Sequence, residues 1–541
     1  MVDLERRLLL KAGALGAGAW AAPGRAQALL RGFTHGVASG EPRPDGIMLW
    51  TRYVPPRGAA ATISYEVADD AGFGRVVARG EAVAAPEHDH CVRPVVTGLS
   101  PGRWYYYRFS GASGARSAIG RTRTLPEGRT GRFRIAAFSC ANKPFGWFNA
   151  YAHAAARNDI DLVVHLGDYI YEYLRGDYPT ERDVVPGRPI DPAGEAFALD
   201  GYRARYASYR IDPDLQSLHQ LYPALCVWDD HETANDAWKD GAENHQPDRE
   251  GSWDERKVAA RRAFRDWLPM SYDDYASYQI GDLLTLIRLE GRLVGRDPEL
   301  SLAPVLAGAT NLDGALAAFR DGPLAEPSRS ILGARQEAWV AERLRASVRA
   351  GTRWQLVAQQ VVMGELSSSP EATPDWLGPD PTPRSRQRVL TGIAAAKAGI
   401  GYNLGSWSGY PAARARFLAA AQEADASLVV LAGDSHNAWA FELANGGRPA
   451  GIEFATNSVT SPGLEWSLRG VSPDPVARSL IAANPELKWC DTAHRGYMLI
   501  DFTPDEVSCE WQLLDTVRER STRAGTHSVR AARGRNRFVA A

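Results

Sequence analysis

The stretch Leu162-Val163-Val164-His165-Leu166-Gly167-Asp168 decides the fold class of this 541-residue chain. Its apolar run lacks the polar alternation of a half-exposed strand, which is typical of a strand buried on both faces. A glycine and an aspartate follow directly, where the chain leaves the sheet. Since α/β sheets place their sites just past the carboxyl ends of such strands, the stretch predicts an α/β domain with a polar site at this edge.

Other apolar runs repeat the pattern. They are residues 132–139 before Cys140, residues 224–228 before Asp229, residues 354–362, and residues 428–431 before Gly433-Asp434. Residues 147–157 have helical spacing. We therefore expect buried strands that alternate with helices over residues 131–515.

The preceding residues have a different pattern. Residues 46–52, 62–67 and 104–109 are short segments rich in Val, Tyr and Thr, and Leu99-Ser100-Pro101-Gly102 forms a turn signal before the last of them. This spacing predicts a small all-β domain over residues 29–127, a sandwich of immunoglobulin or fibronectin-III type, joined to the rest by a linker at 126–130.

Two segments are expected to be long loops, at residues 176–200 and 367–402. Loops of this length are uncommon without a role, so the second is a candidate lid or site wall, with disorder as the alternative.

The chain begins with a predicted export signal. Arg6-Arg7 precedes a short apolar run at 12–22, and Ala26-Gln27-Ala28 supplies a cleavage site. We interpret residues 1–28 as a twin-arginine signal peptide, which makes the export machinery a partner and the mature protein periplasmic or secreted. An amphipathic start or a short membrane anchor is the alternative. No segment reaches membrane-spanning length, so no stable membrane insertion is expected.

The opposite end, residues 516–541, is basic, and a solvated tail is favoured there over an anionic-surface contact. The whole chain is nearly neutral, with 62 Lys and Arg against 64 Asp and Glu. That balance argues against a dedicated nucleic-acid binder. Five cysteines in a chain of this length exclude a disulfide framework and leave at least one thiol unpaired.

Four blocks follow the buried strands in a recognisable order. They are Ser139-Cys140-Ala141-Asn142, Gly167-Asp168-Tyr169-Ile170-Tyr171, Asp229-Asp230-His231-Glu232 and Gly433-Asp434-Ser435-His436. This order resembles the four-part ligand pattern of dinuclear metallophosphatases, which implies an αββα sandwich. The donor types refine the expected metals. A thiolate, a phenolate, a bridging carboxylate and an imidazole suit Fe(III), whereas a site of carboxylate oxygens suits Ca, Mn or Mg.

The chain resembles the alkaline phosphatase D (PhoD-like) family more closely. The resemblance rests on the four blocks and on Ala38-Ser39-Gly40-Glu41-Pro42, Leu49-Trp50-Thr51-Arg52, Gly409-Tyr410-Pro411 and Thr460-Ser461-Pro462-Gly463. It implies a phosphomonoesterase and phosphodiesterase that uses Fe(III) and calcium. The implied iron ligands are Cys140, Asp168, Tyr171 and His436. The implied calcium ligands are Asp168, Asp230 and Asp434, with Asp229 in the outer shell or at a second calcium.

Two stretches depart from the family pattern. Leu289-Glu290-Gly291-Arg292 stands for a block of L-D-x-R type, and Trp407-Ser408-Gly409-Tyr410 lacks the carboxylate of W-D-G-Y. Substrate range and the site wall near Ser408 are therefore where we expect this chain to differ.

The expected mechanism is attack of a metal-bound hydroxide or oxide on phosphorus, without a protein nucleophile. His231 would donate a proton to the leaving alkoxide or hold a phosphoryl oxygen, and Asn235 would hydrogen-bond the substrate. The expected substrates are small phosphate esters, hydrolysed to acquire phosphate.

Several alternatives stay open. The enzyme could be a phosphodiesterase specialised for phospholipids or teichoic acids, or the chain could be a secreted binding protein with a structural metal. Cys140 could be a buried structural thiol or pair with another cysteine, namely Cys91, Cys226, Cys490 or Cys509. Asp168 and Asp434 could instead be helix N-caps.

Overall fold

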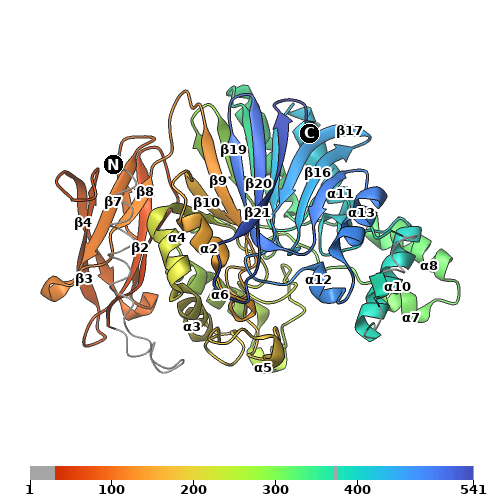
Figure 1. Cartoon of the computed structure of the whole chain (residues 1–541), viewed down its shortest axis with the longest axis horizontal. Helices are drawn as coiled ribbons and strands as arrows, with labels where there is room; N and C mark the ends of the chain where they lie inside the picture. Colours follow the sequence, from red (N-terminus) through yellow and green to blue (C-terminus); the bar gives the residue numbers. More distant parts are fainter. Residues whose placement is uncertain (1–30, 370–375, 379–380, 382, 540–541) are drawn as a thin grey trace.

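The computed structural model describes residues 31–369, 376–378, 381 and 383–539, so the predicted signal peptide at 1–28 lies outside the described residues. Two large β-sheets face each other at the centre of the molecule, and helices cover their outer faces (Figure 1). A smaller, four-stranded sheet formed by N-terminal strands packs at one side of this sandwich, next to β2 (Gly46–Val54). The predicted α/β class is confirmed.

The first large sheet has the strand order β21-β20-β19-β9-β10-β11-β1-β2-β5, with β6 paired to β2. The strands are β1 (Gly32–Gly40), β2 (Gly46–Val54), β5 (Cys91–Val92), β6 (Val95–Thr97), β9 (Phe133–Phe138), β10 (Leu162–His165), β11 (Pro223–Cys226), β19 (Arg495–Phe502), β20 (Glu506–Leu514) and β21 (Ala524–Ala532). In its centre β9, β10 and β11 are parallel, and His165 pairs with both Phe138 and Cys226. The residues that follow these three strands therefore leave the sheet at the same edge.

The second large sheet has the order β12-β13-β14-β15-β17-β16-β18. Its strands are β12 (Ala276–Ile280), β13 (Leu284–Arg288), β14 (Trp354–Ala358), β15 (Leu428–Ala432), β16 (Ala438–Asn445), β17 (Arg448–Ala455) and β18 (Leu487–Asp491). Strands β13, β14, β15 and β17 are parallel. The chain after β15 brings Asp434 toward the loops of the first sheet.

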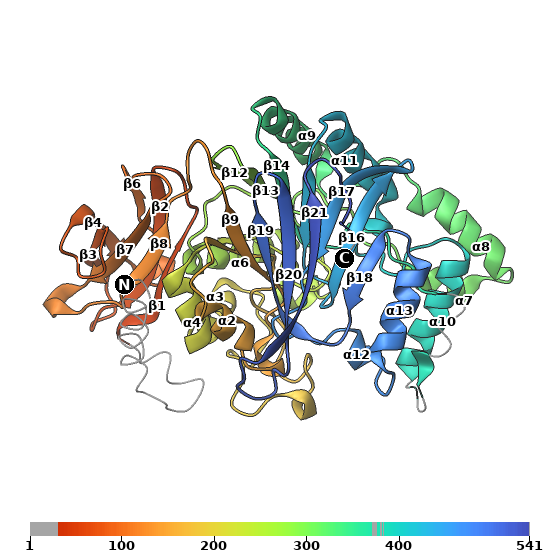
Figure 2. The ribbon, with the colours of Figure 1, turned by 45° about the horizontal axis from the view of Figure 1, so that its top comes forward.

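Alternate side chains of the central strands pack into two different hydrophobic cores, one on each face of the sheet, as expected for strands buried on both faces. Val429 and Leu431 of β15 belong to the core that contains the first sheet, whereas Leu428 and Val430 pack on the opposite side. The first core includes side chains of α2 (Asn149–Ala155), α3 (Leu199–Arg210), α4 (Pro213–Leu221) and α6 (Trp253–Trp267). The second includes α9 (Gly333–Arg349), α11 (Pro411–Glu423) and α13 (Pro473–Ala483) (Figure 2). The shorter or peripheral helices are α5 (Pro247–Glu250), α7 (Ala303–Gly308), α8 (Leu312–Phe319), α10 (Pro383–Lys397) and α12 (Leu464–Ser467).

The N-terminal part is all-β, as predicted. Its four-stranded sheet, β4-β3-β7-β8, is formed by β3 (Ala61–Ala68), β4 (Val76–Ala84), β7 (Trp104–Ser110) and β8 (Gly120–Arg123). Val67 and Tyr107 of this sheet share a buried core with Leu49 of β2. However, β1 pairs in parallel with β11, so the other layer of this sandwich continues the large sheet. The immunoglobulin or fibronectin-III type and the domain boundaries remain predictions.

The C-terminal tail differs from the prediction. Residues 516–541 were expected to be a solvated basic tail, but β21 within them pairs with β20 over its whole length. The stretch Thr526-His527-Ser528-Val529 has strand propensity, and the His527 ring stacks on Trp489 at 4.0 Å. The many arginines of this segment suggested a solvated tail. Exposed charges are, however, also typical of an edge strand, where they prevent pairing with a further strand.

The segment 367–402 also differs from the expected long loop, because α10 occupies residues 383–397. Pro383 suits the first helical turn, and the alanines near its end favour helix. Residues 370–375, 379–380 and 382 lie outside the described part. The other segment, 176–200, has only a 3-10 turn at Glu181–Asp183 before α3 begins at Leu199. Nowhere in the described residues is there a helix long and apolar enough to cross a membrane.

Candidate metal centre

Residues from four strand ends converge at one edge of the sandwich. Cys140 follows β9, Asp168 follows β10, Asp230 follows β11, and both Asp434 and His436 follow β15. The possible ligand atoms form three groups, and within each group all atoms lie within 4.8 Å of one another. The groups are Cys140, Asp168 and His436; Asp168, Asp230 and His231; and Asp229, Asp230 and Asp434. Asp168 therefore belongs to the first two groups, and Asp230 belongs to the last two.

The backbone at these residues has an unusual conformation. Cys140, Asp168, Asp434 and His436 have φ angles of 57°, 55°, 56° and 61°, in the left-handed region that non-glycine residues rarely adopt. Such strain clusters at functional sites, where the surrounding structure maintains it. Gly167 is required for the same close approach, because a Cβ there would lie 2.3 Å from the Cβ of Asp229.

Three buried carboxylates each have one oxygen that accepts a hydrogen bond from the protein and one oxygen that accepts none among the described residues. The bonded oxygens are Asp168 Oδ2 (from the Tyr171 hydroxyl, 2.8 Å), Asp229 Oδ1 (from Arg292 Nε, 2.5 Å) and Asp230 Oδ2 (from the Asp236 N–H, 2.7 Å). Asp168 Oδ1, Asp229 Oδ2 and Asp230 Oδ1 have no hydrogen-bond partner among the described residues. Since buried carboxylate oxygens need a donor or a cation, these residues fit metal binding.

The electrostatics point the same way. Burial and neighbouring carboxylates raise the pKa of Asp168, of Asp229 and of Asp434. Burial would also raise the pKa of Asp230, but Arg292 and His231 lower it below its usual range. The protein therefore provides too little positive charge for all four carboxylates, and bound cations would supply the rest.

Tyr171 and His436 are oriented by their other contacts. The Tyr171 hydroxyl donates to Asp168, accepts a hydrogen bond from Ser461 Oγ at 2.7 Å, and lies 3.4 Å from His436 Nε2. His436 Nδ1 donates to the Pro462 carbonyl at 2.8 Å, which leaves Nε2 as the unprotonated nitrogen facing Tyr171. Burial lowers the pKa of His436 to about 3, so the ring is neutral and suited to bind a cation.

Cys140 is fully buried, with its Sγ 3.0 Å from Ser139 Oγ. Burial and the Asp168 carboxylate raise the pKa of the thiol, so its deprotonation requires nearby positive charge. All five cysteines are free, so the alternative of a disulfide at Cys140 is wrong. The N-cap alternative is also wrong, because no helix begins after Asp168 or Asp434.

His231 belongs to a buried hydrogen-bonded pair. Its Nδ1 lies 2.7 Å from Glu172 Oε2, and Glu172 Oε1 accepts from the Asn235 N–H and from Asn244 Nδ2. Burial would lower the pKa of His231, but the carboxylates around it, Asp168 first, raise it well above its usual value. The Asn235 amide donates to Asp236 and Glu243. A bond from Asn235 to substrate would replace one of these.

Sequence reasoning missed two residues of this centre. Arg292, known only as part of a departure from the family pattern, is 1% exposed and its Nη2 lies 2.7 Å from Asp434 Oδ1 and 3.5 Å from Asp230 Oδ1. Arg292 lies just past the carboxyl end of β13, where polar residues of α/β sites are expected, so the same reasoning applied to this strand would have found it. Glu232 was named within its block without a role. Its carboxylate accepts the backbone N–H groups of Asp168, Tyr169 and Asp229, and so ties two ligand loops together.

A cavity of about 290 Å³ lies against the Pro462 side of the centre. Phe145 and Trp466 supply aromatic walls. The charged lining residues include Arg495 and Arg518 together with Asp183, Glu465 and Asp515. Its volume is close to the lower end of the range for small-molecule pockets.

Two facing mixed sheets with clustered ligand residues at their strand ends define a protein of the metallophosphatase class. The same fold occurs in purple acid phosphatase PPD1 from yellow lupin (Lupinus luteus) seeds, at a TM-score of 0.52, 13% identity, and coverage of 92% of this chain and 74% of that one.

The chain belongs to the PhoD-like phosphatase family: residues 135–511 match that family, and residues 19–126 match its N-terminal domain. It is similar to alkaline phosphatase D of Bacillus subtilis (strain 168), with 29% identity over 524 residues, which cover 92% of this chain and 80% of the relative. It is also similar to a solved structure of PhoD, with a TM-score of 0.75, 27% identity, and coverage of 96% of this chain and 94% of that one.

Proposed function

We propose that this protein is a metal-dependent phosphoric ester hydrolase of the alkaline phosphatase D type, which acts on phosphate monoesters and diesters and releases phosphate. The observation that carries the proposal is the convergence of four strand ends on three buried carboxylate oxygens that have no hydrogen-bond partner among the described residues. Family membership supports the same reaction. The cavity of about 290 Å³ beside Pro462 gives room for the organic group of an ester.

We assign Fe(III) to Cys140, Asp168, Tyr171 and His436, because thiolate, phenolate and imidazole donors suit this ion. Calcium is assigned to Asp168, Asp230 and Asp434, with Asp229 beside it; manganese or magnesium would suit the same oxygens. When bound, these cations would neutralise charge on the phosphoryl oxygens and lower the pKa of a bound water.

The protein's own residues supply the proton that the leaving group needs. The water oxygen forms a bond to phosphorus as the water loses a proton to solvent, and the ester P–O bond breaks. The leaving alkoxide takes a proton from His231, which solvent then restores. Glu172, bonded to Nδ1 of His231, keeps the ring in place and stabilises its charged form. The Tyr171 ring packs against the His231 ring, with a centroid distance of 4.1 Å and an angle of 31° between the ring planes.

Phosphate release from p-nitrophenyl phosphate, and the matching assay with bis-p-nitrophenyl phosphate, test this function. Cys140→Ala and Asp168→Ala are expected to abolish turnover. Cys509→Ala removes another fully buried thiol, outside the ligand groups, and is expected to keep it. Unimpaired turnover in both ligand variants would overturn the proposal, whereas metal binding without turnover in the wild type would favour a binding protein.

Export rests on the sequence alone. We propose that Arg6-Arg7 directs the chain through the twin-arginine pathway to the periplasm or the outside of the cell. Replacing both arginines with lysine is expected to leave the protein inside the cell, as measured by fractionation.

A further inference from the structure

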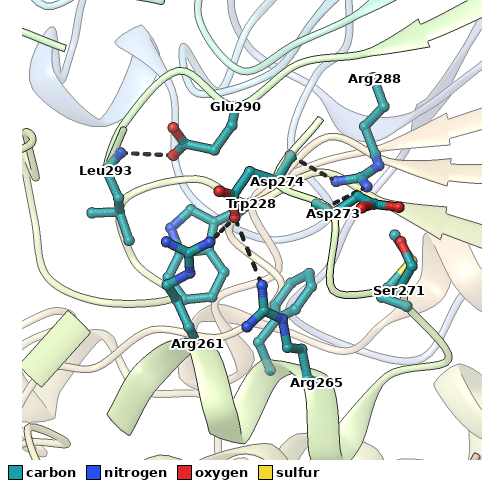
Figure 3. Close-up of a pocket in the computed structure, with 11 residues that line it drawn as sticks. Trp228, Arg261, Arg265, Ser271, Asp273, Asp274, Arg288, Glu290 and Leu293 are labelled. Carbon is teal, nitrogen blue, oxygen red and sulfur yellow. Dashed lines mark hydrogen bonds and ion pairs between the residues drawn. The ribbon is translucent and has the colours of Figure 1, made fainter. Parts of the chain in front are cut away.

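A second, smaller cavity is lined by Trp228 and Glu290, which are close in sequence to Asp229 and Arg292 of the metal centre (Figure 3). Its volume is about 30 Å³, which admits a small ion or a few water molecules. Arg261 and Arg265 reach into this region from α6, one helical turn apart, and Arg288 reaches it from the end of β13.

Three hydrogen-bond donors around this cavity have no acceptor. Trp228 Nε1, Ser271 Oγ and Arg288 Nε are buried atoms without a partner among the described residues. Trp228 and Arg288 are 7% and 4% exposed, so bulk water does not satisfy them. An unsatisfied buried donor is destabilising, and three such donors at one cavity indicate an occupant rich in acceptor atoms.

Positive charge is also crowded here. Burial and the guanidinium groups of Arg261, Arg93 and Arg288 lower the pKa of Arg265 to about 10. One carboxylate, Asp274, is shared between Arg261 and Arg265.

The other buried carboxylate at the cavity is already committed to the backbone. Glu290 accepts N–H groups from Arg292, Leu293 and Val294. The cavity is thus lined by three guanidinium groups, of Arg261, Arg265 and Arg288, and by the carboxylates of Asp273, Asp274 and Glu290. An anion there would meet the guanidinium groups and the unpaired donors.

We propose that this cavity is a second oxyanion site, which binds inorganic phosphate apart from the metal centre. The assignment to phosphate rests on the proposed function, because phosphate is the product of that reaction. The volume excludes an ester with its organic group. An occupant would contact Trp228, which precedes Asp229, and Glu290 and Leu293, which flank Arg292. Phosphate here would thus change turnover without competing with substrate.

Equilibrium dialysis of the metal-loaded protein with radiolabelled phosphate tests the site. We expect two phosphates per wild-type chain and one in the double variant Arg261→Met, Arg265→Met. Arg262→Met is the matched control, because this α6 arginine bonds to Glu87 and does not line the cavity. It should keep two. Ser271→Asp puts a carboxylate beside the cavity and should also bind only one phosphate per chain. This variant tests the site even if the double variant does not fold.

Kinetics provide the second readout. Phosphate should inhibit p-nitrophenyl phosphate hydrolysis by a mixed mechanism in the wild type and by simple competition in the cavity variants, with unchanged kcat/KM when phosphate is absent. One phosphate per wild-type chain, equal to that of the variants, would overturn the proposal and leave only water in the cavity. If no hydrolysis occurred, the dialysis would still decide the cavity separately from the proposed function.

Discussion

Ser461 offers a measurable perturbation of the proposed iron site. Its hydroxyl donates to the Tyr171 oxygen at 2.7 Å, and both side chains are buried. If Tyr171 binds iron as a phenolate, Ser461→Ala removes a hydrogen bond to a charged oxygen, worth about 1.5–3 kcal/mol. At about 1.4 kcal/mol per tenfold, iron affinity should fall about 10- to 150-fold. The phenolate-to-iron absorption should also move to longer wavelength, because the phenolate electrons lose stabilisation.

Competition with a chelator measures the affinity, and visible spectroscopy of the loaded protein measures the band. Ser458→Ala is the matched control, since Ser458 is equally buried in the same loop but donates to the Ser461 carbonyl. The reasoning is refuted if Ser461→Ala binds iron as tightly as the wild type and its absorption band is unshifted. It is also refuted if Ser458→Ala loses as much iron affinity as Ser461→Ala.

Three further predictions concern the proton donor, the counter-ion and a buried acid. His231→Asn should lower kcat for an alkyl phosphate about 10²- to 10⁴-fold but affect p-nitrophenyl phosphate far less, because nitrophenolate leaves without a proton; equal losses in steady-state assays would contradict this role. Arg292→Met leaves Asp229 without its counter-ion, so urea unfolding in chelator should show a loss of about 3–5 kcal/mol that calcium reduces. The same loss with calcium would speak against a cation there. Burial raises the pKa of Glu453 to about 7, above its usual 4.5, so the folded state keeps a proton that the unfolded chain releases. The free energy of unfolding should therefore fall by about 3 kcal/mol as pH rises from 4.5 through 7, and Glu453→Gln should remove that part of the slope; an unchanged slope would exclude Glu453 as its source.

The strand ends were predictable because each depends on a local signal. An unbroken apolar run followed by glycine or acid marks a buried parallel strand, and such strands share one edge of a sheet. Asp168, Asp230 and Asp434 follow such runs, and the structure brings them together with Cys140.

What the sequence did not reveal depends on contacts between distant segments. Arg292 reaches Asp229 only because β13 lies in the facing sheet, which no local pattern indicates. Strand β1 pairs with β11, so the N-terminal part shares a sheet with the rest of the chain, which no local pattern indicates. Strand β21 was obscured by its arginines, which suit both a tail and an exposed edge.

The most direct test of the central claim is metal analysis of the purified protein together with its visible spectrum. The proposed centre predicts iron bound to each chain and a broad visible band from Tyr171 and Cys140 to Fe(III), lost in Tyr171→Phe and Cys140→Ala together with phosphate release. A colourless, iron-free protein that hydrolyses phosphate esters at full rate, and does so equally well in both variants, would contradict it.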